Sequence, residues 1–333
     1  MLDYEIHSTW LKSESKCIPS GMESPMRSVK VSPPFGYYGA KHRLSSQIVK
    51  FLPPHNAWIE AFCGSAAITL AKKPAPIEII NDLDGEIVNL FLQLREAPEQ
   101  LCQAVSLTPY ARDELNHARI STAAASPLER ARRFLIATMM AVNGSVGSPD
   151  STGFSTSPSY TRSRMEARVS RWYNLPDRLA LVAERLRGVR IENQDAVELI
   201  ESFSDRPATL LYLDPPYLMK RSHCYSFDAN EGEFHRRLLE ACNRSRAMIV
   251  ISSYENDLYN ELLTEENGWA RNTIETHTRG TNGKNKPRLE VLWENSASKK
   301  ARETNKIPIR LSQKEKDQKK VNPSRKALMR CIP

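Results

Sequence analysis

The tetrapeptide Asp214-Pro215-Pro216-Tyr217 carries the clearest chemistry in this sequence. It follows the apolar run 208–213, which is typical of a buried strand. Two prolines fix an extended turn and remove two backbone donors, so that carbonyl oxygens are free to accept hydrogen bonds. Asp214 adds a carboxylate and Tyr217 a flat face for a base. Such acceptors would favour attack by a purine amino group on a methyl sulfonium. The alternative is a structural Pro-Pro loop.

A second group of residues follows the expected strand 57–62. Glu60 and Phe62 lead into Gly64, and the residues after this glycine are small. Such a turn lets the backbone approach a ligand closely, although an ordinary strand-to-helix turn needs the same residues. No phosphate-loop lysine follows, which argues against a nucleoside triphosphate.

Acidic residues end the next expected strand, 77–80. Asp82 and Asp84 follow it within four residues. An acid at this place can accept hydrogen bonds from a ribose diol. Asp84 is better explained as the cap of the following helix, so Asp82 is the expected ligand contact.

Elements that alternate between strand and helix must position these groups. The expected strands are 57–62, 77–80, 189–192, 208–213, 247–252, 269–276 and 289–294, and the expected helices are 66–73, 84–95, 127–141, 195–203, 232–243 and 255–264. This alternation predicts an α/β fold with a mostly parallel, Rossmann-like sheet that helices cover on both faces. Ligands of such sheets bind beyond the carboxyl ends of the strands. The mainly helical stretch 100–187 interrupts the alternation and is interpreted as an inserted domain.

The chain has 333 residues, of which 40% are hydrophobic, and this is ample for one sizeable core. The longest apolar runs are too short for a bilayer, and residues 1–30 have no apolar segment typical of a secretory signal. Six dispersed cysteines without a Cys-x-x-Cys pair favour free thiols, and no cluster predicts a metal site. We therefore expect a cytoplasmic protein that binds neither membrane nor metal.

The formal charge of +8 is concentrated at one end of the chain. Residues 298–333 carry a net charge of +9, which leaves the remaining chain near neutral at −1. We interpret 298–333 as a disordered, solvated tail, with a non-specific electrostatic arm for DNA as the alternative. Residues 1–30 are polar and aperiodic, and we expect a weakly ordered lead-in.

These motifs, joined with the segment Phe35-Gly36-Tyr37-Tyr38-Gly39-Ala40-Lys41, occur in an order that resembles the Dam-type (alpha-group) adenine DNA methyltransferases. The resemblance covers roughly residues 33–295. It implies S-adenosylmethionine as cofactor and transfer of its methyl group to N6 of an adenine flipped out of duplex DNA. It places the catalytic domain in 31–99 and 188–297 and DNA recognition in 100–187.

The resemblance also implies roles for individual residues. Asp214, Pro215, Pro216 and Tyr217 match the catalytic tetrapeptide, and Lys41 matches a lysine expected near the methionine carboxylate of the cofactor. The matching cofactor contacts are Tyr37, Lys41, Glu60, Phe62, Gly64, Asp82, Asp195 and Asp214. Asp82 is the expected ribose contact and Asp195 the expected contact of the cofactor adenine. Ala40 and Ala66 stand where the family usually has glycines.

The expected DNA contacts lie in two regions. Asn143 begins a segment similar to the DNA-reading loop of the family, but Gly147 stands near the arginine of members that read GATC, so GATC recognition is not supported. Arg162, Arg164, Arg168 and Arg171 could contact phosphates or form a solvated helix face. Lys284, Lys286 and Arg288 belong to a basic loop, where we expect a hairpin near the DNA.

Three other functions fit parts of the sequence. A related tetrapeptide could serve methylation of RNA or of a protein amide. A nicotinamide-dependent oxidoreductase would share the sheet, but Gly-x-Gly-x-x-Gly is missing. A non-catalytic DNA-binding relative would explain the two alanines. We expect double-stranded DNA as partner and a monomer, with a transient dimer on DNA as the alternative.

Overall fold

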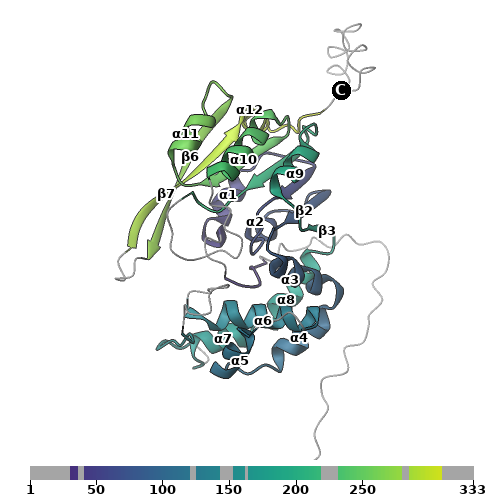
Figure 1. Ribbon diagram of the computed structural model, residues 1–333, viewed down its shortest axis with the longest axis vertical. Coiled ribbons are helices and arrows are strands. Elements are labelled where there is room, and N and C mark those ends of the chain that lie inside the picture. The colour runs from purple at the N-terminus through teal and green to yellow at the C-terminus, as the bar shows by residue number, and fades with distance from the viewer. Residues whose placement is uncertain are drawn as a thin grey trace, which may run out of the picture. The chain divides into compact units, whose positions relative to one another are not determined.

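The computed structural model describes residues 31–36, 41–120, 125–142, 153–161, 164–218, 232–279 and 285–309. In this part of the chain, seven strands form one sheet in the order β3-β2-β1-β4-β5-β7-β6 (Figure 1). The strands are β1 Ala57–Glu60, β2 Ile77–Asn81, β3 Val189–Glu192, β4 Thr209–Leu213, β5 Met248–Ser253, β6 Trp269–Arg279 and β7 Asn285–Asn295. This confirms the predicted strands, although β6 and β7 extend further toward each other than the sequence indicated.

The sheet is parallel except at one edge. Strands β1 to β5 pair in parallel, while β7 is antiparallel to both β5 and β6. Parallel strands need crossover connections, and helices supply them here. The hairpin of β6 and β7 at the edge was expected from the late strands, and its pairing confirms that expectation.

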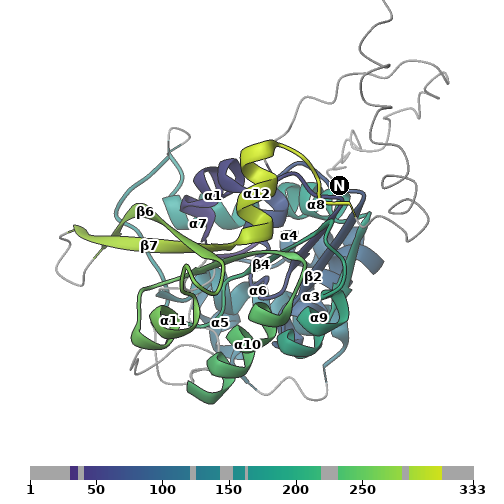
Figure 2. The same ribbon diagram turned by 90° about the horizontal axis from the view of Figure 1, so that it is seen from above.

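Helices cover both faces of this sheet (Figure 2). Ile59, Leu211 and Ile249 belong to one buried cluster, which includes residues of α9 Ala196–Phe203, α10 Gly232–Arg244 and α11 Asp257–Leu262. Their neighbours Trp58 and Leu210 belong to a second cluster, with residues of α1 Ser45–Phe51, α2 Ala67–Ala71 and α12 Ser296–Thr304. Adjacent strand residues point to opposite faces, so uninterrupted apolar strands produce two cores.

A block of helices lies between β2 and β3 in the chain. It consists of α3 Gly85–Glu96, α4 Pro98–Ser106, α5 Arg112–Ala118, α6 Pro127–Met140, α7 Ala167–Tyr173 and α8 Leu175–Arg185. Leu101 of α4, Leu135 of α6 and Leu179 of α8 lie in one buried cluster that also contains Ala66 and Leu70 of the first strand-to-helix connection. The helices were predicted; their interpretation as a separate recognition domain stays a prediction.

Helix α12 corrects the prediction of a disordered tail over 298–333. Asn295 caps the helix by accepting a hydrogen bond from the backbone N–H of Ser298 at 3.0 Å. Ala301 is buried against the sheet, and the Arg302 guanidinium pairs with the buried Glu294 carboxylate at 2.5 Å. Because the segment is rich in Lys and Arg, its sequence indicated disorder rather than a helix with buried contacts. The prediction is wrong for 298–304, and residues beyond 309 lie outside the described part of the chain.

Removal of α12 should destabilise the protein strongly. A chain that ends after Asn295 leaves the Glu294 carboxylate buried without Arg302, which costs about 3–5 kcal/mol, and exposes apolar surface of the sheet. A chain that ends after Ile309 keeps the helix and is the matched control. Urea unfolding of both proteins measures the difference. Equal unfolding free energies would contradict the role assigned to α12.

Candidate active site

Three of the predicted site residues lie where the strand order of the sheet reverses. Strand β1 lies between β2 and β4, although β4 follows much later in the chain. The carboxyl ends of parallel strands lie at the same edge, and ligands of open α/β sheets bind at such a switch point. Glu60 ends β1, Asp82 follows β2 and Asp214 follows β4. The fold therefore brings together three acids that are far apart in sequence.

Lys41 links the tetrapeptide 214–217 to an earlier part of the chain. It begins a short 3-10 helix, η1 Lys41–Arg43, and is 5% exposed. Its ammonium lies 2.5 Å from Asp214 Oδ1 and donates to the Tyr217 hydroxyl at 2.6 Å. We expected the methionine carboxylate of a cofactor as the partner of Lys41, whereas the structure gives it protein partners.

Glu290 completes this cluster from strand β7. Its carboxylate is 2% exposed and lies 3.4 Å from the Lys41 ammonium. It accepts hydrogen bonds from the Tyr217 hydroxyl at 3.3 Å and from the Ser252 hydroxyl at 2.7 Å. Glu290 was not among the site residues predicted from the sequence. A single acid within the apolar run 289–293 was the signal that could have found it, because a carboxylate in a buried strand requires partners.

The aromatic ring of Tyr217 packs within the protein. Its centroid lies 4.3 Å from that of Tyr254, at an interplanar angle of 35°, and the Lys41 ammonium lies 4.9 Å from the same ring. These contacts leave Tyr217 8% exposed. The tyrosine is thus held at both its ring and its hydroxyl, which fixes the turn that carries Asp214.

Burial and neighbouring charges set the ionisation of this cluster. Burial raises the pKa of Asp214 to about 6; the Lys41 ammonium opposes this shift and the Glu290 carboxylate adds to it. Burial alone would lower the pKa of Lys41, but Asp214 and Glu290 raise it above its usual range. Lys41 therefore stays charged at neutral pH, while Asp214 titrates close to neutrality.

The turn after β1 contains two residues with a left-handed backbone conformation. Gly64 and Ala66 have positive φ angles of 46° and 53°, a region that costs a residue with a side chain about 1–2 kcal/mol. Asp82 Oδ2 accepts from the Gly64 backbone N–H at 2.8 Å, and Asp82 Oδ1 accepts from that of Asp84 at 3.0 Å. Asp84 in turn caps α3, as predicted. Asp82 thereby ties the turn to the end of β2.

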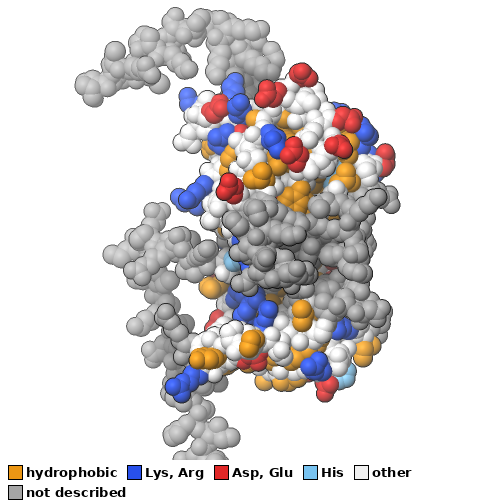
Figure 3. Space-filling view, turned by 90° about the vertical axis from the view of Figure 1, so that its left-hand side faces the viewer, with side chains coloured by type: hydrophobic (Ala, Val, Ile, Leu, Met, Phe, Trp, Pro, Cys, Tyr) orange, Lys and Arg blue, Asp and Glu red, His pale blue; other side chains and the backbone are white. Residues whose placement is uncertain are grey.

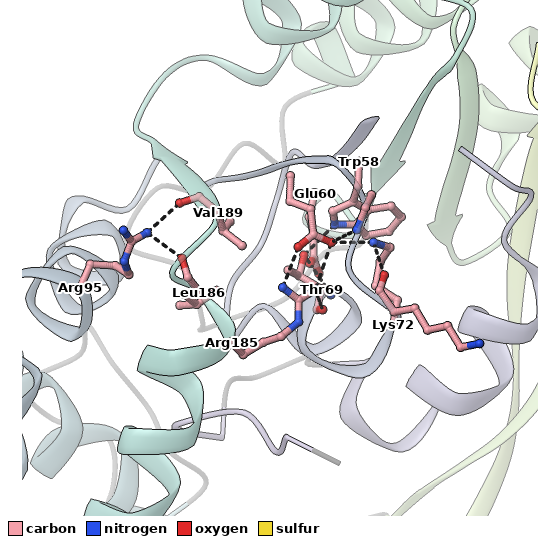
Figure 4. A network of polar contacts seen from close by, with 11 residues as sticks. Trp58, Glu60, Thr69, Lys72, Arg95, Arg185, Leu186 and Val189 are labelled. Atoms are coloured by element: carbon pink, nitrogen blue, oxygen red, sulfur yellow. Dashed lines mark hydrogen bonds and ion pairs between the residues drawn. The ribbon is translucent and has the colours of Figure 1, made fainter. Parts of the chain in front are cut away.

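The Glu60 side chain is buried and is directed at Thr69 of α2 (Figure 4). Its carboxylate accepts hydrogen bonds from the backbone N–H of Thr69, at 2.9 Å, and from the Thr69 hydroxyl. The same threonine accepts from Trp58 Nε1 at 2.7 Å and from Arg185 at its carbonyl at 2.8 Å. Burial raises the pKa of Glu60 to about 7, and the hydrogen bonds from Thr69 oppose this shift.

An ion-pair network continues from Arg185 to the amino end of β2. The buried Glu78 carboxylate pairs with Arg185 and with Lys72, both at 2.6 Å. Arg95 donates to the carbonyls of Leu186 and Val189 at 2.6 and 3.0 Å (Figure 4). These contacts fasten helices α3 and α8 to the strands beside the site.

Two other predicted cofactor contacts follow strands on either side of β2, Phe62 after β1 and Asp195 after β3. Asp195 is half-buried and caps α9, with its carboxylate accepting from the Val197 backbone N–H at 2.7 Å. Phe62 is half-buried, and its ring packs edge-on against Phe234 with centroids 6.3 Å apart. Tyr37 lies outside the described residues.

The described arginines of the expected DNA surface lie at and before α7. Arg164 has a positive φ of 59°, and Arg164 and Arg171 are exposed while Arg168 is half-buried. Tyr160 and Tyr173 flank them and are 76% and 71% exposed. Asn143, Arg162 and Lys284 fall outside the described residues, as do the side chains of Lys286 and Arg288 in β7. On the face drawn in Figure 3, basic side chains are interspersed with acidic and hydrophobic ones.

Neither a helix suited to crossing a membrane nor a cluster of metal-ligand side chains is found among the described residues. None of their helices combines the length and apolar character that a bilayer crossing requires. Their His, Cys, Asp and Glu side chains include no group of three or more arranged to hold a metal ion.

Residues 37–277 match the model of the D12 class N6 adenine-specific DNA methyltransferase family. The chain belongs to this family. The match covers η1, the turn after β1 and the tetrapeptide, and it identifies the protein as an adenine-specific DNA methyltransferase. Glu290 lies beyond the matched residues. A comparison with curated protein sequences found no match.

Several solved structures are similar to this methyltransferase over most of its length. A methyltransferase from Geobacter sulfurreducens is 11% identical, with 79% of this chain and 80% of that chain covered and a TM-score of 0.33. The precorrin-6y C5,15-methyltransferase from Geobacter metallireducens is 10% identical, with 76% and 86% covered and a TM-score of 0.32. An S-adenosylmethionine-dependent methyltransferase from Agrobacterium tumefaciens is also 10% identical, with 77% and 60% covered and a TM-score of 0.32.

The ionisation of Glu60 should make the stability of the protein depend on pH. Because its folded pKa of about 7 exceeds its ordinary value, Glu60 contributes stability below pH 4.5 that is lost as the pH rises through 7. The variant Glu60→Gln should therefore lose less stability than the wild type between pH 4.5 and 8, by about 1–3 kcal/mol.

Glu78→Gln is the matched control for this measurement. Hydrogen bonds and ion pairs with Arg185 and Lys72 lower the pKa of Glu78 against the effect of its burial, so this carboxyl contributes stability that is lost as the pH falls. Urea unfolding across the pH range should show opposite changes of slope in the two variants. An unchanged slope in Glu60→Gln would contradict the assignment.

Proposed function

We propose that this protein transfers the methyl group of S-adenosylmethionine to N6 of an adenine flipped out of duplex DNA, as a Dam-type member of its family. One observation carries the proposal: the Asp214 carboxylate follows the buried strand β4 at the switch point and is held there by Lys41 at 2.5 Å. A fixed acceptor at this position suits an amino group that must be oriented before it reacts.

The residues around Asp214 fit the cofactor. The half-buried Asp82 offers a carboxylate for the ribose diol beside a turn whose positive φ angles bring backbone close to a ligand. Asp195 and Phe62 at neighbouring strand ends suit the adenine. The negatively charged cluster of Asp214 and Glu290 suits a sulfonium. When bound, S-adenosylmethionine supplies an electrophilic methyl group.

The contribution of the protein is orientation and exclusion of water. Asp214 and the carbonyl of Pro215 would hold the two N6 hydrogens, so that the nitrogen lone pair is directed at the methyl group. Flipping the adenine costs roughly a few kcal/mol. Orientation of two bound reactants can contribute about 7–11 kcal/mol to catalysis, so no covalent enzyme intermediate is needed.

The region at and before α7 is proposed to hold the DNA. Arg164, Arg168 and Arg171 supply positive charge for phosphates, and the exposed rings of Tyr160 and Tyr173 lie next to them in sequence. Binding through such contacts weakens with salt, because each neutralised phosphate releases counterions.

Replacement of Asp214 should abolish methyl transfer and preserve the fold. Asp214→Ala removes the acceptor of the amino group, which should lower kcat by roughly 10²–10⁴-fold. Lys41 keeps Glu290 as a buried counter-charge, so the variant should fold. Asp205→Ala, at an exposed acid paired with Arg246, is the matched control. Transfer of a tritiated methyl group to duplex DNA, RNA and protein, followed by nucleoside analysis, measures the effect.

The outcomes separate the alternatives. The proposal expects N6-methyladenine in duplex DNA with the wild type and with Asp205→Ala. Label in RNA or protein would show that the substrate is not DNA. DNA binding that is independent of the cofactor and leads to no methyl transfer would indicate a non-catalytic relative. Full activity of Asp214→Ala would sink the assignment of the site.

A further inference from the structure

The cluster around Lys41 contains one carboxylate more than is needed to neutralise the lysine, and this carboxylate belongs to Glu290. Lys41 and Asp214 alone form a neutral pair at 2.5 Å. Glu290 adds a second carboxylate to the same ammonium at 3.4 Å and is 2% exposed. Burying a carboxylate costs free energy unless the group is ion-paired and hydrogen-bonded. The extra carboxylate therefore calls for an explanation in the chemistry of the site.

Glu290 contacts the other members of the cluster: it forms an ion pair with Lys41 and accepts a hydrogen bond from the Tyr217 hydroxyl. Lys41 has three ammonium hydrogens, and Asp214, Tyr217 and Glu290 stand within reach of them. The Tyr217 hydroxyl accepts from Lys41 and so directs its own hydrogen to Glu290. Glu290 thus holds the lysine and the tyrosine that contact the catalytic turn.

We propose that Glu290 is a positioning residue for methyl transfer, which fixes Lys41 and Tyr217 and gives the buried cluster a net negative charge so that Asp214 can take the proton released by the amine. The inference rests on the proposed function and deepens it. Residues 37–277 of the family match do not include Glu290, which reaches the site from β7.

The proton balance of the reaction explains why one extra negative charge is useful. The N6 lone pair forms the bond to the methyl carbon, and the carbon–sulfur bond breaks with its electron pair moving to sulfur. The nitrogen then carries one hydrogen and one positive charge too many, and that proton passes to an Asp214 oxygen. With Lys41 protonated and both carboxylates ionised, the cluster has a charge of −1 before the step and is neutral after it.

The groups that face Asp214 favour this proton uptake. Glu290 on β7 and, more weakly, Glu60 at the end of β1 are the carboxylates near it, while Lys41 on η1 opposes them. The phenols of Tyr212 and Tyr259 are held neutral because burial raises the pKa of each well above its ordinary value. The pKa of Asp214 is raised to about 6 by burial, with Lys41 opposing and Glu290 adding to the shift.

Glu290→Gln and Glu294→Gln form a matched pair of variants. Both residues are buried acids of β7, and both are ion-paired: Glu290 with Lys41, and Glu294 with Arg302. Each substitution replaces a carboxylate by an amide of nearly the same shape. Glu294 lies outside the cluster, so its variant shows what the loss of a buried ion pair in this strand does by itself.

The pH dependence of kcat/KM for the cofactor should distinguish the two variants. In the wild type the rate should fall as the pH drops through about 6, where Asp214 becomes protonated. Glu290→Gln removes a carboxylate that raises the pKa of Asp214. The midpoint of the pH profile should therefore move down by about one pH unit, and the plateau rate should be roughly threefold to tenfold lower. In Glu294→Gln the midpoint should stay at the wild-type value.

A measurement without cofactor or DNA tests the same claim independently of activity. Aspartate labelled with ¹³C at the carboxyl carbon reports the titration of Asp214, with its signal assigned from the variant Asp214→Asn. The midpoint should fall by about one pH unit in Glu290→Gln and remain unchanged in Glu294→Gln. Glu290→Asp keeps the charge, so it should keep the midpoint but lose plateau rate because Lys41 and Tyr217 are held less closely.

The outcomes are decisive even where one variant folds poorly. An unchanged Asp214 midpoint in folded Glu290→Gln overturns the proposal, and so does a wild-type plateau rate in Glu290→Asp. Should Glu290→Gln be unfolded by circular dichroism, the plateau rate of Glu290→Asp still decides for or against the positioning role. A wild type that methylates no DNA would instead remove the proposed function, which is a different result from an active wild type with an unaffected midpoint.

Discussion

The site depends on the contacts that the buried Lys41 ammonium makes. It lies between Asp214 after β4, the hydroxyl of Tyr217 and Glu290 of β7, and it comes from η1 near the start of the described chain. Three separated segments are therefore fixed by one buried charge. Burial favours a neutral lysine, whereas the carboxylates of Asp214 and Glu290 favour the charged form and raise the pKa of Lys41.

The sheet makes this cluster possible by its strand order. The switch between β1 and β4 opens the carboxyl edge, and Asp82 joins the turn after β1 to the end of β2. The antiparallel strand β7 beside β5 then brings Glu290 next to Ser252. In a parallel sheet, acids that follow the strands all lie at one edge. Glu290 reaches the site instead from β7, which runs in the opposite direction.

The sequence was sufficient for features that depend on local patterns. Strand β4, the tetrapeptide after it and the Asp84 cap of α3 were predicted because apolar runs, prolines and capping residues act within a few positions. The partners of Lys41 and the role of Glu290 depend on pairing between β5 and β7, which no local pattern specifies. Helix α12 was missed because basic residues surround its few core contacts, such as Ala301.

Asp214 is proposed to orient the amino group of a flipped adenine. A crystal structure of the protein with duplex DNA and an unreactive analogue of S-adenosylmethionine tests this role. We expect an extrahelical adenine whose N6 lies about 2.7–3.2 Å from an Asp214 oxygen, with Lys41 still bound to Glu290. An adenine that remains stacked in the duplex, or one whose N6 is held by other residues, would contradict it.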